Sequence, residues 1–177
     1  HYPCILVIGA RQVGKSTLLH ELRPEGMEYV TLDDYTLAAQ ARKDPVGFLQ
    51  EHPAPLFIDE VQYAPELLRA IKMKVDAAKS NGLYWLTGSQ QFHLMEGVSE
   101  SLAGRVGILD LHSLSQRESL GLGNSAPVFD PEDLNSYASS AAPCDIHELY
   151  RRIWRGGYPV LSKDKELEPD SFFDSYV

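Results

Sequence analysis

A glycine-rich segment near the start of this 177-residue chain limits its possible folds more than any other part of the sequence. It reads Gly9-Ala10-Arg11-Gln12-Val13-Gly14-Lys15-Ser16-Thr17 and fits the pattern G-x-x-x-x-G-K-[ST]. The glycines let main-chain N–H groups surround a phosphate without obstruction by a Cβ atom. Lys15 supplies a positive charge for β- and γ-phosphate oxygens, and the Ser16 hydroxyl is placed for Mg²⁺. We therefore expect residues 9–17 to bind a nucleoside triphosphate.

The segments on either side of this loop support the interpretation. Residues 4–8 are a short, continuous apolar run, which is typical of a buried parallel strand. Residues 16–22 have a helical pattern that ends before Pro24. The N-terminus of such a helix carries the partial positive charge that anions favour, so the order of strand, loop and helix suits phosphate binding.

The rest of the first 112 residues alternates apolar strands with amphipathic helices. Further strands are predicted at residues 29–32, 56–58, 83–86 and 106–111. Helices are predicted over residues 35–42, from Pro45, from Pro65 to the Asn81-Gly82 pair, over residues 90–96 and around residues 99–103. This alternation predicts an α/β fold with a parallel sheet that helices cover on both faces.

The character of the sequence changes after residue 112. Helices are expected at the capping-box pair Ser115 and Glu118, from Asp130-Pro131, over residues 146–155 and from Pro169. We therefore expect a nucleotide-binding core at 1–112 and a helical lid or linker at 113–177 that is truncated at its C-terminal end. Since the chain begins with His1 and its first strand follows almost at once, we expect it to be part of a longer protein.

The charge and composition restrict the classes of partner. The net charge of −9 does not support nucleic-acid binding through a broad basic face, although it leaves a local basic patch open. The sequence contains no apolar run long enough to span a membrane, and we expect no membrane partner. Two cysteines at unrelated positions form no disulfide framework. These features predict a cytoplasmic protein.

Asp59 and Glu60 follow the apolar run at residues 56–58 and supply the second half of the expected chemistry. A carboxylate at the carboxyl end of a strand can hold Mg²⁺ directly or through water, and we assign this role to Asp59. Glu60 can act as the general base that activates the attacking water. The adjacent pair is typical of enzymes that hydrolyse nucleoside triphosphates, and the lack of an Asn-Lys-x-Asp sequence disfavours the GTPases.

Several short motifs occur together along the chain: the loop at 9–17, Leu32-Asp33-Asp34, Phe57-Ile58-Asp59-Glu60-Val61-Gln62, Leu86-Thr87-Gly88-Ser89, Leu102-Ala103-Gly104-Arg105-Val106 and Gly156-Gly157-Tyr158-Pro159. In this combination the sequence resembles the AAA-type predicted ATPases of bacteria and archaea that carry an uncharacterised C-terminal domain. The resemblance implies a P-loop NTPase fold, an AAA-like three-layer sandwich with a five-stranded parallel sheet in the order 5-1-4-3-2. It also implies ATP as the nucleotide, residues 1–112 as the ATPase core and an absent C-terminal domain as a partner.

The resemblance implies roles for three further residues. The end of the fourth strand in such ATPases carries a polar sensor of the γ-phosphate or the attacking water, and Thr87 and Ser89 are the candidates here. Their alternative role is that of a strand end and a helix cap. Arg105 stands just before the fifth strand, where these ATPases place an arginine finger. It would act in trans, which requires at least a dimer, or in cis after closure. The alternative is a structural arginine bonded to a loop carbonyl.

Three arginines in the helix at residues 146–155 also have two possible roles. Arg151, Arg152 and Arg155 would belong to a lid that carries a second sensor arginine, or they form a solvated basic helix end, which the helix dipole favours.

Three functions fit these features. We favour an ATPase that converts ATP and water to ADP and phosphate and couples this reaction to a conformational change in an attached domain or partner. A nucleotide-dependent binding module with little turnover and a small-molecule phosphotransferase remain as alternatives.

Overall fold

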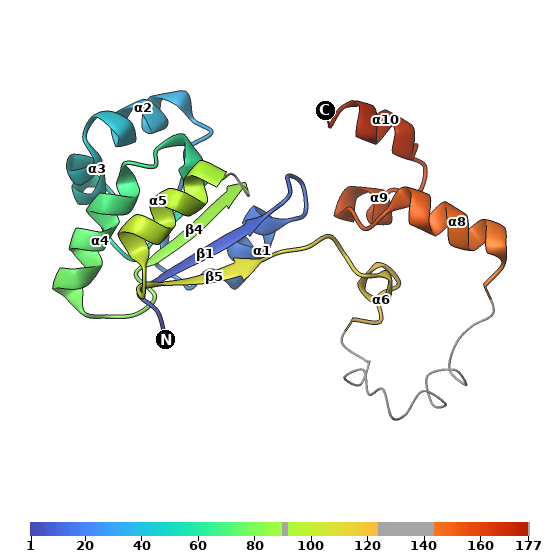
Figure 1. Ribbon diagram of the computed structural model, residues 1–177, viewed down its shortest axis with the longest axis horizontal. Coiled ribbons are helices and arrows are strands. Elements are labelled where there is room, and N and C mark those ends of the chain that lie inside the picture. The colour runs from blue at the N-terminus through green and yellow to red at the C-terminus, as the bar shows by residue number, and fades with distance from the viewer. Residues whose placement is uncertain (90–91, 124–143, 177) are drawn as a thin grey trace. The chain divides into compact units, whose positions relative to one another are not determined.

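The computed structural model describes residues 1–89, 92–123 and 144–176 (Figure 1). It forms two compact units, His1–His112 and Ser113–Val177. The helix predicted from Asp130 lies outside the described residues. In the part of the chain that is described, every helix is too short or too polar to cross a lipid bilayer.

The sheet at the centre of the first unit contains five parallel strands. They are β1 (Cys4–Gly9), β2 (Glu28–Thr31), β3 (Leu56–Asp59), β4 (Tyr84–Ser89) and β5 (Val106–Asp110). Their spatial order is β2-β3-β4-β1-β5, which confirms the predicted order 5-1-4-3-2 read from the opposite edge. All pairs of neighbouring strands are parallel, so their carboxyl ends lie along one edge of the sheet.

Helices cover both faces of this sheet, as the sequence predicts (Figure 1). They are α1 (Lys15–Leu22), α2 (Tyr35–Lys43), α3 (Pro45–Glu51), α4 (Leu67–Ala78) and α5 (Phe92–Leu102). Successive side chains of a strand point to opposite faces. Leu6 and Ile8 of β1 accordingly join the larger apolar cluster with α2 to α5, whereas Val7 joins the smaller cluster with Leu19 of α1. The result is a three-layer α/β arrangement.

One helix differs from the prediction. The sequence predicts two helices, over residues 90–96 and 99–103, but α5 runs without interruption from Phe92 to Leu102. The expected break falls at Gly97. A Cβ atom at this position would lie 3.2 Å from the Leu68 side chain of α4. The glycine therefore allows close packing of α5 on α4, and its propensity cost of about 1 kcal/mol does not end the helix.

The second unit consists of short helices in its described part. These are α6 (Gln116–Ser119), α8 (Ile146–Arg155), α9 (Pro159–Lys163) and α10 (Pro169–Asp174), of which α9 was not predicted. The predicted capping box is confirmed at α6. The Glu118 N–H donates to Ser115 Oγ at 3.2 Å, and the Ser115 N–H donates to Glu118 Oε2 at 2.7 Å.

Candidate nucleotide-binding site

The glycine-rich segment forms the connection between β1 and α1, at the carboxyl edge of the sheet (Figure 1). Gly9 has a φ of +150°, and a Cβ atom there would lie 2.2 Å from the Leu111 carbonyl oxygen, so a side chain does not fit. Gly14 has a φ of +100° and allows the chain to turn into the helix. Helix α1 begins at Lys15 without a side-chain cap. Its first main-chain N–H groups therefore suit an external acceptor such as phosphate.

The other residues of the loop divide into buried and exposed positions. Val13 is buried and packs the loop onto the protein. The exposed positions are Ala10, Arg11, Gln12 and Thr17, and Ser16 is half-buried. Gln12 adopts a left-handed conformation with a φ of 60°.

Lys15 is buried at the first turn of α1, with only 5% of its surface exposed. Its ammonium group donates hydrogen bonds to the carbonyl oxygens of Gly9, at 3.2 Å, and Ala10, at 2.8 Å. These bonds use two of the three ammonium donors. They hold the positive charge over the start of the loop, where a phosphate bound by the loop amides would benefit from it.

Asp59 is buried at the carboxyl end of β3 and connects side chains from three other elements. Its Oδ1 atom accepts hydrogen bonds from the Ser16 hydroxyl, at 2.7 Å, and from the Thr87 hydroxyl. Its Oδ2 atom accepts from the Tyr29 hydroxyl at 3.2 Å. The structure thus brings together the two residues predicted to hold metal, Ser16 and Asp59.

The donor set at Ser16 and Asp59 fits magnesium. In proteins Mg²⁺ usually takes one or two carboxylates and completes its shell with water and substrate phosphates. A hydroxyl from the phosphate-binding loop and a carboxylate from a neighbouring strand are the protein ligands of this arrangement. Both lie here at the carboxyl edge of the sheet, next to the loop that fits phosphate.

Glu60 leaves β3 in a left-handed conformation, with a φ of 58°. A non-glycine residue in this region costs about 1–3 kcal/mol, and such residues gather at functional sites. The Glu60 N–H donates to Thr87 Oγ1 at 3.0 Å, and its carboxylate accepts a hydrogen bond from the Gln62 side-chain amide. Gln62 belongs to a short 3-10 turn, η1 (Val61–Tyr63), and its Oε1 atom accepts from the Ser89 N–H at 3.3 Å.

The two sensor candidates at the end of β4 occupy different environments. Thr87 is fully buried, and its hydroxyl joins Asp59 to the main chain of Glu60. The Ser89 hydroxyl is also buried, but among the described residues it has no hydrogen-bond partner. Buried polar groups are nearly always paired, so an unpaired hydroxyl requires an explanation. Ser89 lies opposite Gly9 in the β1–β4 register, beside the start of the loop.

Arg105 directly precedes β5 and lies at the amino end of the sheet, opposite the carboxyl end at which the phosphate-binding loop begins. Its carbonyl oxygen accepts from the N–H of Cys4, the first residue of β1, at 3.0 Å. Its guanidinium donates to both carboxylate oxygens of Asp76, at 2.5 and 3.0 Å, and to the Ala103 carbonyl oxygen at 3.0 Å. The chain therefore does not bring Arg105 to its own phosphate-binding loop. These contacts match the alternative of a structural arginine, and a role in trans, or in cis after closure, stays a prediction.

Tyr29 is a site residue that the sequence analysis missed. Its ring packs against His20, with centroids 4.3 Å apart, and against Phe57, with centroids 5.1 Å apart. Burial, and then the negative charge of Asp59, raises the pKa of the Tyr29 phenol. The sequence signal is weak, because Tyr29 reaches Asp59 only through the β2–β3 register that pairs Thr31 with Asp59.

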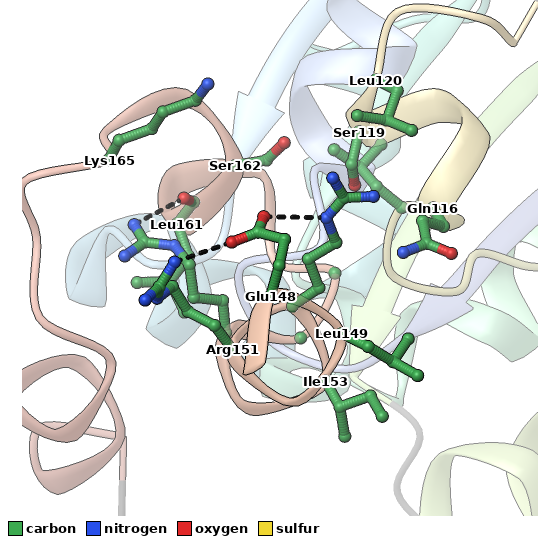
Figure 2. A pocket seen from close by; sticks show the side chains of 15 residues that line it. Gln116, Ser119, Leu120, Glu148, Leu149, Arg151, Ile153, Leu161, Ser162 and Lys165 are labelled. Atoms are coloured by element: carbon green, nitrogen blue, oxygen red, sulfur yellow. Dashed lines mark hydrogen bonds and ion pairs between the residues drawn. The ribbon is translucent and has the colours of Figure 1, made fainter. Parts of the chain in front are cut away.

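The second unit contains a cavity of about 600 Å³ among α6, α8 and α9 (Figure 2). The three α8 arginines with two predicted roles line this cavity and pair with local acceptors. Arg151 and Arg152 both donate to the Glu148 carboxylate, at 2.7 and 3.0 Å, and Arg155 donates to the carbonyl oxygens of Leu161, at 3.0 Å, and Asp164, at 2.7 Å. Their role as lid or second sensor stays a prediction.

Known proteins include relatives of similar sequence. The chain is 32% identical over 124 residues to an uncharacterized protein of Mycobacterium bovis and to one of Mycobacterium tuberculosis. These alignments cover 70% of this chain and 27% of each relative, so the matched region spans about a quarter of their length. Among solved structures, an unliganded sugar kinase from Janibacter sp. HTCC2649 is 18% identical and has a TM-score of 0.35. The match covers 84% of this chain and 82% of the kinase, and a score this low does not establish a shared fold.

A protein family described as an AAA domain matches residues 1–120, which include the whole sheet, the phosphate-binding loop and the Asp59-Glu60 pair. The chain belongs to this family and is an AAA-type nucleotide-binding domain.

Proposed function

We propose that this chain binds ATP with Mg²⁺ and hydrolyses it to ADP and phosphate. The observation that carries the proposal is the meeting of Ser16 and Asp59 at the carboxyl edge of the sheet, with Glu60 as the next residue. A phosphate-binding loop alone would fit nucleotide binding without turnover. The buried carboxylate beside the loop, followed by a second acidic side chain, adds the groups that hydrolysis requires.

Each residue has a defined part in this reaction. The main-chain N–H groups of the loop and the Lys15 ammonium hold the β- and γ-phosphates. Ser16 and Asp59 hold Mg²⁺, which when bound neutralises the negative charge that develops on the phosphates. Glu60 orients the attacking water and accepts its proton as the new oxygen–phosphorus bond forms and the bond to the leaving oxygen of ADP breaks.

The residues at the end of β4 complete the proposed site. The Thr87 hydroxyl keeps the Asp59 carboxylate and the Glu60 main chain in a fixed relation, because it bonds to both. The Ser89 hydroxyl, which has no hydrogen-bond partner among the described residues, is the better candidate for contact with the γ-phosphate or the attacking water. Such a contact would give this buried hydroxyl a hydrogen-bond partner, as buried polar groups nearly always have.

We further propose that the nucleotide state is coupled to movement of an attached domain or partner. The two relatives extend well beyond the matched region, since that region covers 27% of their length. Any such extension of this chain would provide a domain on which the nucleotide state can act. An oligomer in which Arg105 reaches a neighbouring site is a second form of this proposal.

Steady-state phosphate release in the presence of ATP and Mg²⁺ tests the reaction, and titration with a fluorescent ATP analogue tests binding. Lys15→Ala removes the buried ammonium group and should abolish binding, whereas Lys43→Ala, at the exposed end of α2, should leave it unchanged. Binding without phosphate release by the wild type would identify a nucleotide-dependent binding module instead. Equal binding by Lys15→Ala and the wild type would contradict the assignment of the loop.

A further inference from the structure

Gln62 joins two parts of the site that lie on different strands. Its side-chain amide nitrogen donates to Oε2 of Glu60, which follows β3. Its side-chain oxygen accepts a hydrogen bond from the main-chain N–H of Ser89, at the end of β4. One side chain thus holds the Glu60 carboxylate to the strand that lies next to β1.

The orientation of the Gln62 amide is determined by its partners. A glutamine amide can be placed in two ways, with its oxygen and nitrogen exchanged, and the hydrogen-bond network decides between them. The Ser89 main-chain N–H is a donor only, so the oxygen of Gln62 must face Ser89. The NH₂ group must then face Glu60, where it donates to a group that accepts hydrogen bonds when ionised.

The local backbone accounts for this contact between residues two positions apart. Glu60 has a left-handed φ of 58°, and the chain continues directly into the 3-10 turn η1. Val61, within this turn, is fully buried and anchors it to the core. The turn and its anchor place the Gln62 side chain between Glu60 and the end of β4.

We propose that Gln62 is a positioning residue that holds the Glu60 carboxylate in line for activation of the attacking water. The proposal rests on the proposed function, in which Glu60 is the general base. The position of Ser89, the other partner of Gln62, determines the direction in which Gln62 holds the Glu60 carboxylate. Ser89 lies opposite Gly9 in the β1–β4 register, so Gln62 holds Glu60 toward the strand end from which the phosphate-binding loop begins.

The kinetic test compares variants of similar size. Gln62→Met keeps the length of the side chain and removes both hydrogen bonds. We expect it to lower kcat about tenfold or more and to leave the KM for ATP within about twofold, since misplacement of a catalytic group by about 1 Å costs up to about a hundredfold. Gln62→Glu should lower kcat further, because it replaces the donor that faces the Glu60 carboxylate with an acceptor.

Measurement of Gln62→Met in a variant that lacks the Glu60 carboxylate separates a positioning role from a general effect on stability. In Glu60→Gln the base is absent, so Gln62→Met should reduce the remaining rate by no more than about twofold. Gln40→Met is the matched control, since Gln40 makes the same kind of amide-to-carboxylate bond to exposed Glu51, away from the site. It should keep the wild-type kcat. An equal loss from Gln62→Met in both backgrounds, or an unchanged or higher kcat in the wild-type background, would overturn the proposal.

A spectroscopic measurement tests the contact without turnover. The side-chain NH₂ resonances of Gln62 in a ¹⁵N–¹H spectrum are assigned by their disappearance in Gln62→Met. They should shift in Glu60→Ala and keep their position in Glu51→Ala. Resonances that do not respond to Glu60→Ala would overturn the proposal whether or not the protein hydrolyses ATP. Absence of phosphate release from the wild type, by contrast, would contradict the proposed function.

Discussion

The Ser16 hydroxyl donates a 2.7 Å hydrogen bond to the Asp59 carboxylate, although 43 positions of sequence separate the two residues. Ser16 lies in α1, the helix that follows β1, and Asp59 is the last residue of β3. These two strands are not neighbours, because β4 lies between them. Adjacent strands are about 4.8 Å apart, so the contact crosses a distance of ~10 Å at the level of the sheet. Thr87 of β4 bonds to the same carboxylate oxygen because Ile58 pairs with Leu86 in the β3–β4 register, which brings the next residues of the two strands, Asp59 and Thr87, side by side.

Replacement of Glu60 by glutamine should separate binding from hydrolysis. Glu60→Gln keeps the shape of the side chain but cannot accept a proton from water. We expect ATP affinity within about twofold of the wild type and a rate of phosphate release that is lower by about 10²–10⁴, as the loss of a general base implies. The measurements are titration with a fluorescent ATP analogue and steady-state phosphate release. Wild-type turnover by the variant would rule out Glu60 as the base.

The Thr87 hydroxyl should contribute to stability as well as to catalysis. Thr87→Val preserves the shape of the side chain but leaves the Glu60 N–H without its acceptor. We expect a loss of about 1–3 kcal/mol in the free energy of unfolding, because a partly buried donor would remain unsatisfied. Urea denaturation measures this loss. Thr87→Ser keeps the hydroxyl and should retain most of the phosphate release that Thr87→Val loses. Equal activity of the two variants would show that the hydroxyl has no part in the reaction.

The Tyr29 hydroxyl should stabilise Asp59 in the folded state. Tyr29→Phe keeps the ring contacts with His20 and Phe57 but removes the donor to Asp59 Oδ2. We expect a loss of about 1 kcal/mol in the free energy of unfolding, measured by urea denaturation. The same change at Tyr35, whose side chain is 80% exposed, should have no effect.

The contribution of Tyr29 should also depend on pH. Burial and the Asp59 charge raise the pKa of the phenol above its ordinary value of 10.0, so the folded state favours the neutral form. The difference in stability between the wild type and Tyr29→Phe should therefore be complete below pH 10.0 and decline as the pH rises through the raised pKa. A difference that instead grew above pH 10.0 would contradict this assignment.

The ion pair between Arg105 and Asp76 should support stability at neutral pH and lose its effect in acid. Hydrogen bonds from Arg105 lower the pKa of the Asp76 carboxyl below its ordinary value of 3.8, so this contribution is present above pH 3.8. Asp76→Asn should have a lower urea midpoint than the wild type at pH 7. The two midpoints should converge as the pH falls through the lowered pKa, because the wild-type carboxylate is then protonated.

The same pair distinguishes a structural Arg105 from an arginine finger. If Arg105 only holds the amino edge of the sheet, Arg105→Ala and Asp76→Asn should reduce stability alike and leave the rate of phosphate release per folded molecule unchanged. If Arg105 acts on a neighbouring site, only Arg105→Ala should reduce the rate, and the effect should depend on protein concentration. Phosphate release measured across a dilution series decides between these outcomes.

The sequence by itself predicted those parts of the candidate site that consist of consecutive residues. The loop at residues 9–17 and the Asp59-Glu60 pair are motifs whose chemistry lies within a few consecutive residues. Apolar runs likewise predicted all five strands. Burial accounts for this in β1 and β3, whereas β5 is apolar in sequence although Ile108 and Leu109 are exposed. The order of the strands came from the resemblance to known ATPases, since local patterns do not determine which strands are neighbours.

The tertiary structure alone decided which distant side chains meet. Tyr29 reaches Asp59 through the register of β2 on β3, and Gln62 reaches Ser89 through a turn whose shape depends on the left-handed Glu60. Arg105 shows the same dependence, because its place before β5 in a parallel sheet puts it at the edge opposite the loop. A motif specifies which groups are present, but the contacts between strands arise from packing of the whole sheet and its helices. That packing is a collective property of residues far apart in the chain.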